Sequence, residues 1–523
     1  MVKKMEKLLD ENRNMQDYLY TRGFLITNDA NIKEDGYPFY GNWNCEKVKG
    51  FCFYIHNKQK IHIRELKDRS IAFLIGHAYD PLCGLHDEQE ILEYVYSKNI
   101  YERISELTGV FVMGVVTSNS IKFIGDAACM QSIFYGTVNG FMYISSHSYL
   151  LKDITGVTND PFIEKLISYK YYKLFGRMLP GDRTSYCEFK RVEPNYEYEY
   201  KDDNHFRKKR FYPLKKIEIA KNEDDYNKII DQCYEIMKSS MMLIPKKWNR
   251  PAISLSGGCD SKTTLSCVEN YSQYGYFSFI SIDKEEPDAI AAHKIAEMLG
   301  IEHKIYNISR NDNDFENLNV IKSILEQNCG HIGKNNANDI RKRAFFANQD
   351  DFDVEVKSWA SEIVRAYYNK RFHKNKMPRK VTPRMMTAMY KVIVNDRKLA
   401  KGLDDIFMEY LKEYYNDDSF KNMEWYDLIF WEYRVAAWNG LVISGEHNFS
   451  YDLTIPYNNR VLLDLLLHTP LEKRISDVPH KDIQRRGNAL IANSDIAVQN
   501  VEHTKLRAIL EGIYFDIYSR LIV

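Results

Sequence analysis

The sequence predicts an α/β protein of two domains: an N-terminal α+β sandwich over residues 1–215 and a C-terminal domain over residues 216–523, built on a parallel sheet with many helices. A chain of 523 residues is too long for one hydrophobic core. Its first part is rich in short β-like runs. Its second part alternates apolar strand-like runs with helical patterns, which is typical of a parallel sheet covered by helices.

Short apolar runs predict the strands of the first domain, over residues 51–55, 71–76, 110–116, 121–126, 133–136 and 141–146. The last two runs are joined across Asn139-Gly140, a pair typical of tight hairpin turns. Residues 88–107 carry apolar side chains at helical spacing and predict one helix between the early and the late strands.

The second domain begins with a predicted amphipathic helix over residues 226–242. Strands are predicted over residues 252–255, 276–282 and 301–306, and helices over residues 262–268 and 288–299, the latter ending at Gly300. From residue 341 onward the pattern is mainly helical, most clearly over residues 426–441 and 460–467.

The turn Ser256-Gly257-Gly258-Cys259-Asp260-Ser261 lies between a predicted strand and a predicted helix. Its glycines allow the backbone to approach an anion closely, and the first amides of the helix have no partner of their own. Asp260 would repel a phosphate group unless a cation lay between them, which points to Mg²⁺. The turn therefore predicts a phosphate site, with an ordinary strand-to-helix turn as the alternative.

This turn closely resembles the SGGxDS pyrophosphate loop of ATP pyrophosphatases that form AMP, and it lacks the Walker spacing. Within that superfamily the chain resembles asparagine synthetases, β-lactam synthetases and lasso-peptide cyclases. The resemblance implies ATP and Mg²⁺ as cofactors. It implies that Asp260 binds the metal and that the pyrophosphate contacts Ser256, Gly257, Gly258, Asp260 and Ser261.

The first domain resembles the class II glutamine amidotransferase domain of these synthetases, an Ntn-like fold. The matching segments are Leu107 to Phe111, Gly125 to Tyr135, and Ser145 to His147. The family's glutaminase uses a cysteine exposed as the mature N-terminus. Here Val2 follows Met1 and the first cysteine is Cys45, so we expect a domain without glutaminase activity.

Residues 358–367 stand where the family has GEGADEVFGGY. Glu362 and Tyr367 match that pattern, whereas Ser358 and Ser361 replace acidic residues. The resemblance makes Glu362 the candidate general base. An amphipathic helix with one solvated glutamate is the alternative.

A helix of the family carries an acid and an arginine near the acyl substrate, and Glu432 and Arg434 stand at these places. A structural ion pair is the alternative. Residues 455–460 resemble the family's vPFLDhrL signature, with Asn459 in place of the aspartate. Lys481 matches a lysine that stabilises developing negative charge, and a solvated side chain is the alternative.

The composition excludes several classes of function. Lys plus Arg equals Asp plus Glu at 72 each, so no global field attracts nucleic acid. No apolar run has the length of a membrane span. The nine cysteines form no CxxC pair, which predicts reduced thiols in the cytoplasm and no zinc site.

These observations together predict an ATP-dependent ligase that adenylates a carboxylate, releases pyrophosphate and transfers the acyl group to ammonia or to a substrate amine. Asp260, Glu362 and Lys481 are its expected catalytic residues. The carboxylate belongs to a small molecule, a glycan or a peptide, and a homo-oligomer is allowed. The alternatives are a non-catalytic remnant that binds nucleotide or a partner, and a nucleic-acid-modifying ATP pyrophosphatase such as a tRNA thiolase.

Overall fold

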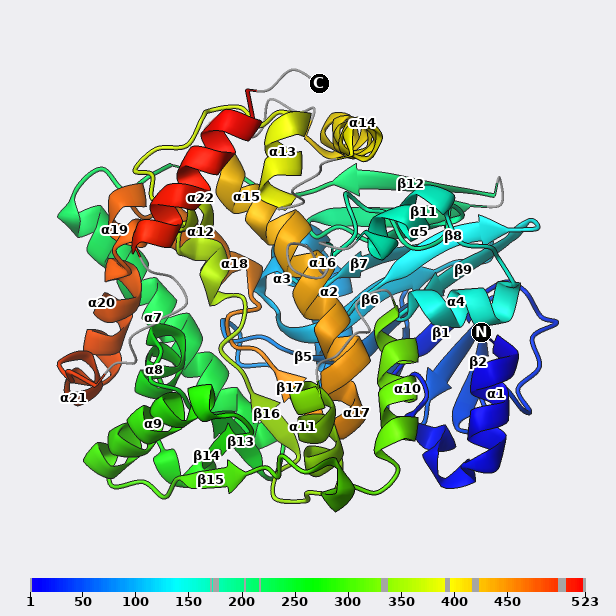
Figure 1. Ribbon diagram of the computed structural model, residues 1–523, viewed down its shortest axis with the longest axis horizontal. Coiled ribbons are helices and arrows are strands. Elements are labelled where there is room, and N and C mark those ends of the chain that lie inside the picture. The colour runs from blue at the N-terminus through cyan, green and yellow to red at the C-terminus, as the bar shows by residue number, and fades with distance from the viewer. Residues whose placement is uncertain are drawn as a thin grey trace.

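The computed structural model describes residues 2–169, 172, 178–201, 204–215, 218–330, 337–390, 396–415, 423–496 and 505–520. The described elements form two stacked antiparallel sheets on one side and a parallel sheet surrounded by helices on the other (Figure 1). The predicted mixed α/β architecture is confirmed at this level. The domain boundary is predicted between residues 215 and 216, and residue 216 lies outside the described residues.

The two antiparallel sheets have six strands each, in the orders β10-β8-β9-β1-β3-β2 and β12-β11-β7-β6-β5-β4. Their strands are β1 (Phe24–Thr27), β2 (Trp43–Val48), β3 (Phe51–His56), β4 (Ile61–Glu65), β5 (Ile71–Tyr79), β6 (Thr108–Val116), β7 (Ser120–Gly125), β8 (Phe134–Val138), β9 (Phe141–Ser145), β10 (Phe189–Arg191), β11 (Tyr196–Lys201) and β12 (His205–Arg210). Phe53 of one sheet and Phe73 of the other meet edge to face, with ring centroids 5.2 Å apart. The sheets therefore share one apolar core.

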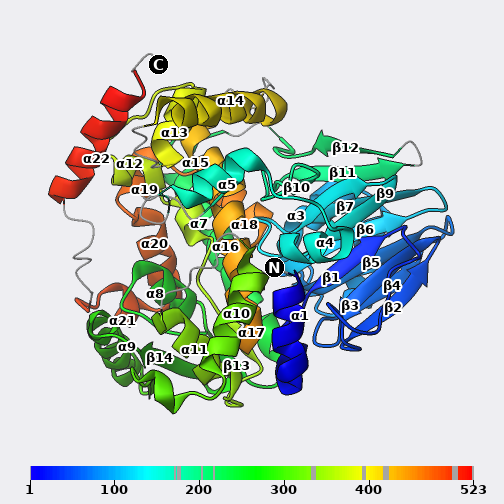
Figure 2. The same ribbon diagram turned by 45° about the vertical axis from the view of Figure 1, so that its right-hand side comes forward.

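Helices cover both outer faces of this sandwich. α2 (Glu88–Ser97) packs on β4 and β5, and α3 (Ile100–Glu106) packs beside α2. The helices α1 (Val2–Glu11), η1 (Arg13–Tyr18), α4 (Ser148–Thr155) and α5 (Pro161–Ser168) complete this part, and Figure 2 shows α1 and α4 next to β1. The expected single helix over residues 88–107 is wrong. Asn99 adopts a left-handed conformation with φ of 54°, which ends α2 and lets α3 begin in a new direction.

The parallel sheet has the order β15-β14-β13-β16-β17. Its strands are β13 (Pro251–Ser254), β14 (Gly275–Ile280), β15 (Lys304–Asn307), β16 (Val354–Val356) and β17 (Asp452–Thr454). From the central β13 the chain first builds one half of the sheet through β14 and β15, and then the other half through β16 and β17. The order therefore reverses between β13 and β16, the position at which ligands bind in open α/β sheets.

Helices surround this sheet and extend away from it. They are α7 (Glu223–Lys247), α8 (Cys259–Ser266), α9 (Glu286–Leu299), α10 (Leu318–Cys329), α11 (Ala337–Ala347), α12 (Tyr367–Arg371), α13 (Pro383–Tyr390), α14 (Arg397–Tyr414), α15 (Trp425–Ile429), α16 (Ala436–Val442), α17 (Asn448–Ser450), α18 (Arg460–Leu467), α19 (Leu471–Ile475), α20 (Val478–Gly487), α21 (Ala489–Ala492) and α22 (Lys505–Tyr518). The predicted helix over residues 426–441 runs through α15 and α16 but contains the π-helical turn η8 (Phe430–Val435).

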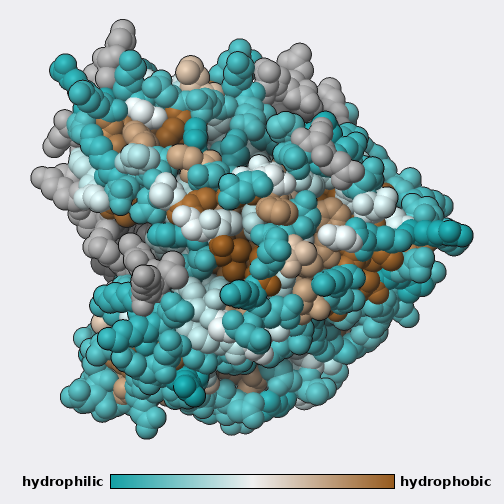
Figure 3. Space-filling view, turned by 90° about the vertical axis from the view of Figure 1, so that its right-hand side faces the viewer, coloured by the Kyte–Doolittle hydropathy of each residue, from teal (hydrophilic) through white to brown (hydrophobic). Residues whose placement is uncertain are grey.

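Buried polar side chains join the two halves of the molecule. Asn458 donates to the carboxylate of Asp126 at 2.8 Å and to the carbonyl of Gly109 at 2.6 Å, and its oxygen accepts from the amide of Ala128. Figure 3 shows a largely hydrophilic outer surface on the sandwich side, with apolar residues in small groups. Over the described ranges, no helix has the length and apolar character that crossing a bilayer requires.

Candidate functional site

The glycine turn lies at the carboxyl end of β13, next to the point where the strand order reverses. β13 ends at Ser254, and α8 begins at Cys259 with Gly258 as its N-cap residue. No described side chain caps this helix start. The first amides of α8 are therefore open to an anion at the carboxyl edge of the parallel sheet.

Hydrogen bonds within the turn hold it in one conformation. The hydroxyl groups of Ser256 and Ser261 lie 2.9 Å apart, and Ser261 also donates to the carbonyl of Ser256. The amide of Gly258 donates to the Ser256 hydroxyl, while the amide of Gly257 donates to the carboxylate of Asp288 at 2.9 Å. Asp288, from the first turn of α9, thus occupies an amide that a phosphate oxygen would otherwise use.

Asp260 sits in the first turn of α8 and contacts a cluster of charged groups. Arg365 donates a hydrogen bond from Nη1 to Asp260 Oδ2 at 2.6 Å. Its Nε and Nη2 donate to the two carboxylate oxygens of Asp477. Lys370 also pairs with Asp477. Burial alone would raise the pKa of Asp477, but the bonds and charges of Arg365 and Lys370 lower it to about 2. These contacts leave Asp260 Oδ1, a buried oxygen, without a hydrogen-bond partner.

His480 of α20 faces the same carboxylate. Its Nε2 lies 3.9 Å from Asp260 Oδ1, and this nitrogen is also buried without a hydrogen-bond partner. Burial lowers the pKa of His480 to about 4, although the Asp260 charge opposes this shift. The imidazole is therefore neutral near pH 7. Asp260 Oδ1 and His480 Nε2 are thus two neighbouring buried polar atoms without hydrogen-bond partners. The carboxylate oxygen is a suitable ligand for a cation such as Mg²⁺.

Glu362 lies across from Asp260, in the 3-10 turn η6 (Ser361–Val364) that follows β16. The structure thus has a tight turn at the place where an amphipathic helix was the alternative. Ala360, at its start, takes a left-handed conformation with φ of 70°. Burial and the neighbouring Asp260 charge raise the pKa of Glu362 to about 7. The side chain can accept or release a proton near neutral pH, as a general base must.

The two serines that stand at acidic positions of the resembled pattern differ in their contacts. Ser358 and Thr264 share a hydrogen bond of 2.8 Å between their hydroxyl oxygens, which links the segment after β16 to α8. Ser361 is fully buried, and its hydroxyl has no hydrogen-bond partner among the described residues.

The guanidinium of Arg434 packs on the aromatic ring of Tyr367 near Glu362. The guanidinium of Arg434 lies 5.2 Å from the ring centroid of Tyr367 and 5.1 Å from that of Trp438. Tyr367 stacks on Phe430 at 4.3 Å, and its hydroxyl accepts from Arg371 at 2.6 Å. The charge of Arg434 also reaches Glu362, where it acts to lower the pKa. Arg434 thus lies beside Tyr367, and its charge reaches Glu362.

Glu432 lies away from this group. It is 1% exposed, and its two oxygens accept from Arg210 at 2.6 and 2.8 Å and from Asn195 at 2.8 Å. These partners belong to the strand region of the first domain. Its geometry is therefore that of the structural ion pair, the alternative interpretation of this position, and leaves no oxygen free for a substrate.

Lys481 is exposed on α20, while the preceding His480 is buried. Burial lowers the pKa of Lys262 on α8, and the charge of Lys481 lowers it further. Lys262 donates to the carbonyl of Ile496 at 3.0 Å. The two lysines thus lie near one another on the side of α8 and α20.

Asn459 has contacts that an aspartate could not make. Its oxygen accepts from the amide of Leu462 and caps α18, while its nitrogen donates to the carbonyl of Glu106 and to the hydroxyl of Thr108. Asn459 therefore serves the contact between the two halves of the molecule.

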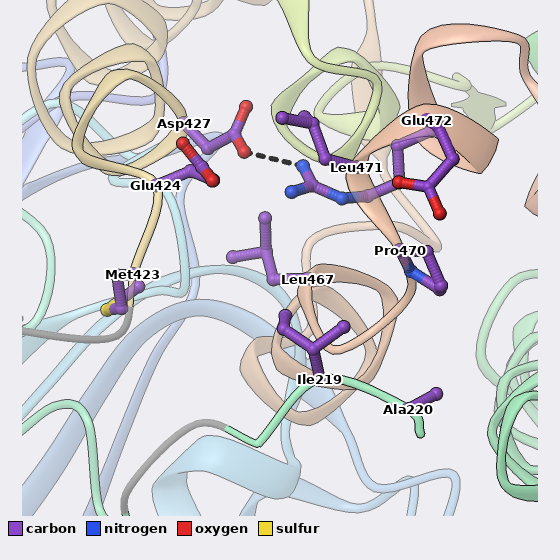
Figure 4. A pocket seen from close by; sticks show the side chains of 10 residues that line it. Ile219, Ala220, Met423, Glu424, Asp427, Leu467, Pro470, Leu471 and Glu472 are labelled. Carbon is purple, nitrogen blue, oxygen red and sulfur yellow. Dashed lines mark hydrogen bonds and ion pairs between the residues drawn. The ribbon is translucent and has the colours of Figure 1, made fainter. Parts of the chain in front are cut away.

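The cavity in Figure 4, of about 300 Å³, lies elsewhere in the helical part. Its lining residues come from the segment before α7 and from the segments around α15, α18 and α19, and are Ile219, Ala220, Met423, Glu424, Asp427, Leu467, Pro470, Leu471, Glu472 and Arg474. Asp427 and Arg474 form a buried ion pair in its wall. None of the predicted site residues lines this cavity.

No protein-family model and no curated protein matches the chain. Among solved structures, the chain is similar to glutamine phosphoribosylpyrophosphate amidotransferase from B. subtilis complexed with ADP and GMP, at 12% identity, with 69% of this chain and 73% of that chain covered and a TM-score of 0.24. It is also similar to an allosteric regulatory enzyme of purine biosynthesis, at 11% identity, with 56% and 60% covered and a TM-score of 0.24. Similarity at such TM-scores supports no functional argument.

Proposed function

We propose that this chain is an ATP-dependent ligase that forms an amide bond through an acyl-adenylate, as its resemblance to asparagine synthetases implies. The observation that carries the proposal is the meeting of three features at one edge of the parallel sheet. These are the open helix start at Gly258, the buried free oxygen of Asp260, and Glu362 with its pKa near neutrality. An ATP-cleaving site needs an anion cradle, a metal ligand and a proton acceptor.

In this proposal the phosphates of ATP bind at residues 256–261 and at the first amides of α8. Asp260 Oδ1 is the side-chain oxygen that would hold Mg²⁺, which when bound would neutralise phosphate charge. Arg365 keeps Asp260 in position through Oδ2. The attacking oxygen belongs to the carboxylate substrate, and the leaving group is pyrophosphate.

The acyl substrate is proposed to lie against Arg434 and Tyr367. An arginine can hold a carboxylate through two parallel hydrogen bonds, and the ring of Tyr367 limits where the guanidinium can move. Glu362 is placed to remove the proton from the attacking amine. Lys481 is exposed, so we propose for it a role only at the outer side of the site, near Lys262.

The amine is proposed to be free ammonia or part of a substrate, with no glutamine hydrolysis in the first domain. A cavity beside the start of β1, lined by Arg22, Gln59 and His77 among others, has a volume of about 10 Å³, the space of about one water molecule. The cysteines of the described residues form no disulfide, which fits a cytoplasmic enzyme.

A second candidate, a nucleotide-binding chain without catalysis, is favoured by two specific contacts. Arg365 already neutralises part of the Asp260 charge, and Asp288 already uses the Gly257 amide. Both contacts compete with Mg²⁺ and with phosphate. If they persist when nucleotide binds, the chain binds ATP weakly and does not cleave it.

The deciding experiment mixes the purified chain with ATP, Mg²⁺ and a panel of carboxylic acids with and without amines, and measures pyrophosphate. Acid-dependent pyrophosphate with AMP and an amide product is the expected result. ATP binding without turnover for any acid would establish the second candidate, and RNA-dependent pyrophosphate would establish a nucleic-acid-modifying enzyme. Asp260→Ala is expected to abolish turnover, with Asp314→Ala on an exposed turn as the matched control.

A further inference from the structure

Three metal-ligating side chains meet on the first domain, far from the glycine turn in sequence. Asp80, Cys83 and Glu106 each offer one ligand atom, and these atoms all lie within 4.8 Å of one another. Asp80 follows the last residue of β5, Cys83 lies in the turn after it, and Glu106 is the last residue of α3. Two separate elements therefore supply the donor atoms.

The turn is held so that one oxygen of Asp80 stays free. Oδ1 accepts from the amides of Leu82 at 2.8 Å and Cys83 at 3.0 Å, and the amide of Gly84 donates back to the carbonyl of Asp80. Asp80 is fully buried, and its Oδ2 has no hydrogen-bond partner. A buried carboxylate oxygen without a partner is costly, and a cation at this position removes the cost.

The neighbouring groups add acceptors and negative charge. Cys83 donates its thiol proton to the Tyr94 hydroxyl at 3.0 Å, and Tyr94 donates to Glu106 Oε2 at 3.3 Å. Burial and mutual repulsion raise the pKa of Glu106, and burial raises the pKa of Asp80. Among the described residues, neither carboxylate forms an ion pair with a lysine or arginine. Arg103 stacks on the ring of Tyr94, 3.6 Å from its centroid, and its charge acts to lower the pKa of both carboxylates.

We propose that Asp80, Cys83 and Glu106 form a divalent metal site suited to Zn²⁺. One thiolate and two carboxylate oxygens are a donor set that Zn²⁺ accepts, whereas Mg²⁺ and Ca²⁺ prefer oxygen donors alone. Cys83 is exposed, so a water molecule can complete a four-coordinate site from the solvent side. Binding replaces the thiol proton, which is released to solvent.

The proposed metal would fasten the turn after β5 to the end of α3. That helix end also contacts the second half of the molecule, because the carbonyl of Glu106 accepts from Asn459 at 2.7 Å. The site is independent of the ATP site in its residues. The lack of CxxC spacing does not exclude such a metal site, since two of the three ligands are carboxylates. One of these, Glu106, comes from α3 and not from the turn after β5.

The test uses the full chain after removal of metals with a chelator. Zn²⁺ is titrated against a chromophoric chelator, and Co²⁺ is added separately to look for a thiolate-to-metal charge-transfer band. The expected result is one Zn²⁺ per chain and a Co²⁺ band. Cys83→Ser is expected to abolish the band and weaken Zn²⁺ binding at least about tenfold, and Glu106→Gln is expected to weaken it similarly.

Cys187→Ser is the matched control, because Cys187 is also exposed and also lies beside a carboxylate, at 3.4 Å from Asp160, but in no three-ligand cluster of the described residues. It is expected to bind Zn²⁺ as the unaltered chain does. Absence of stoichiometric Zn²⁺ overturns the proposal, as does full retention of Zn²⁺ and of the Co²⁺ band in Cys83→Ser. Circular dichroism of each variant establishes that it is folded.

Discussion

Arg365 joins Asp260 to Asp477 through three of its nitrogen atoms, with contacts of 2.6, 2.8 and 3.0 Å. The residues on either side come from different parts of the chain, α8 and the start of α20. A single guanidinium therefore fixes the position of the acid that we propose as metal ligand. It also lowers the negative charge that a phosphate would meet there.

Arg365→Ala is expected to reduce the free energy of unfolding by about 2–4 kcal/mol, because it leaves two half-buried carboxylates without their shared cation. Arg365→Lys is expected to recover part of this loss, since it keeps the charge but not the fork. Urea denaturation measures both. Arg310→Ala is the control, because Arg310 pairs with Asp283 on the exposed surface, and it should stay close to the unaltered protein. Equal losses in the two alanine variants would contradict the arrangement.

Glu362 makes stability depend on pH. Its pKa rises from 4.5 to about 7 on folding, so between these values the folded protein binds more protons than the unfolded chain. The free energy of unfolding therefore falls as pH rises through this window, and the whole loss is present above pH 7. A glutamine at position 362 does not ionise, so Glu362→Gln should not show this loss. The free energy of unfolding of the variant minus that of the unaltered protein should therefore rise by about 1–3 kcal/mol from low to high pH.

Urea denaturation at several pH values measures this difference, with Glu302→Gln, an exposed position, as the control. A difference for Glu362→Gln that does not change with pH would show that the carboxyl titrates as it does in the unfolded chain. If Glu362 is also the base that deprotonates the amine, the rate of amide formation in the unaltered enzyme should rise with pH around neutrality, and this rise should be absent in the variant.

Local features of the fold could be predicted from the sequence because they depend on neighbouring residues. The hairpin at Asn139-Gly140 forms as expected, with φ of 52° and 82°, and β8 pairs antiparallel with β9. The glycine turn and the C-cap at Gly300 also follow from local patterns. The break at Asn99 was missed, because the apolar spacing continues on both sides of it.

Contacts between distant segments could not be predicted in the same way. Arg365 and Asp477 are 112 positions apart, and Gly257 and Asp288 are 31 apart. A charged side chain carries no local sign of which distant partner it will meet. For the same reason, the ion pair of Glu432 with Arg210 could not be predicted, because Arg210 comes from β12, far away in the sequence.

Asp288 is expected to compete with phosphate for the Gly257 amide. Asp288→Ala frees this amide and removes a negative charge near the turn, so ATP should bind about fivefold more tightly, equivalent to about 1 kcal/mol. Isothermal titration calorimetry measures the Kd. Glu286→Ala removes a charge from the same end of α9 at an exposed position that bonds no amide of the turn, and it should change the Kd less. Weaker ATP binding in Asp288→Ala would instead indicate that Asp288 supports the turn for nucleotide.

A substitution at Asn458 tests the contact between the two halves of the molecule. Asn458→Asp places a second carboxylate 2.8 Å from the buried carboxylate of Asp126, whose pKa burial already raises. Two like charges cannot both stay ionised there, so the free energy of unfolding should fall by about 3–5 kcal/mol near neutral pH. The loss should shrink as pH falls and one carboxyl binds a proton. Asn313→Asp, on an exposed turn, is the control, and a loss no larger than in this control would mean that the two halves do not meet through Asn458.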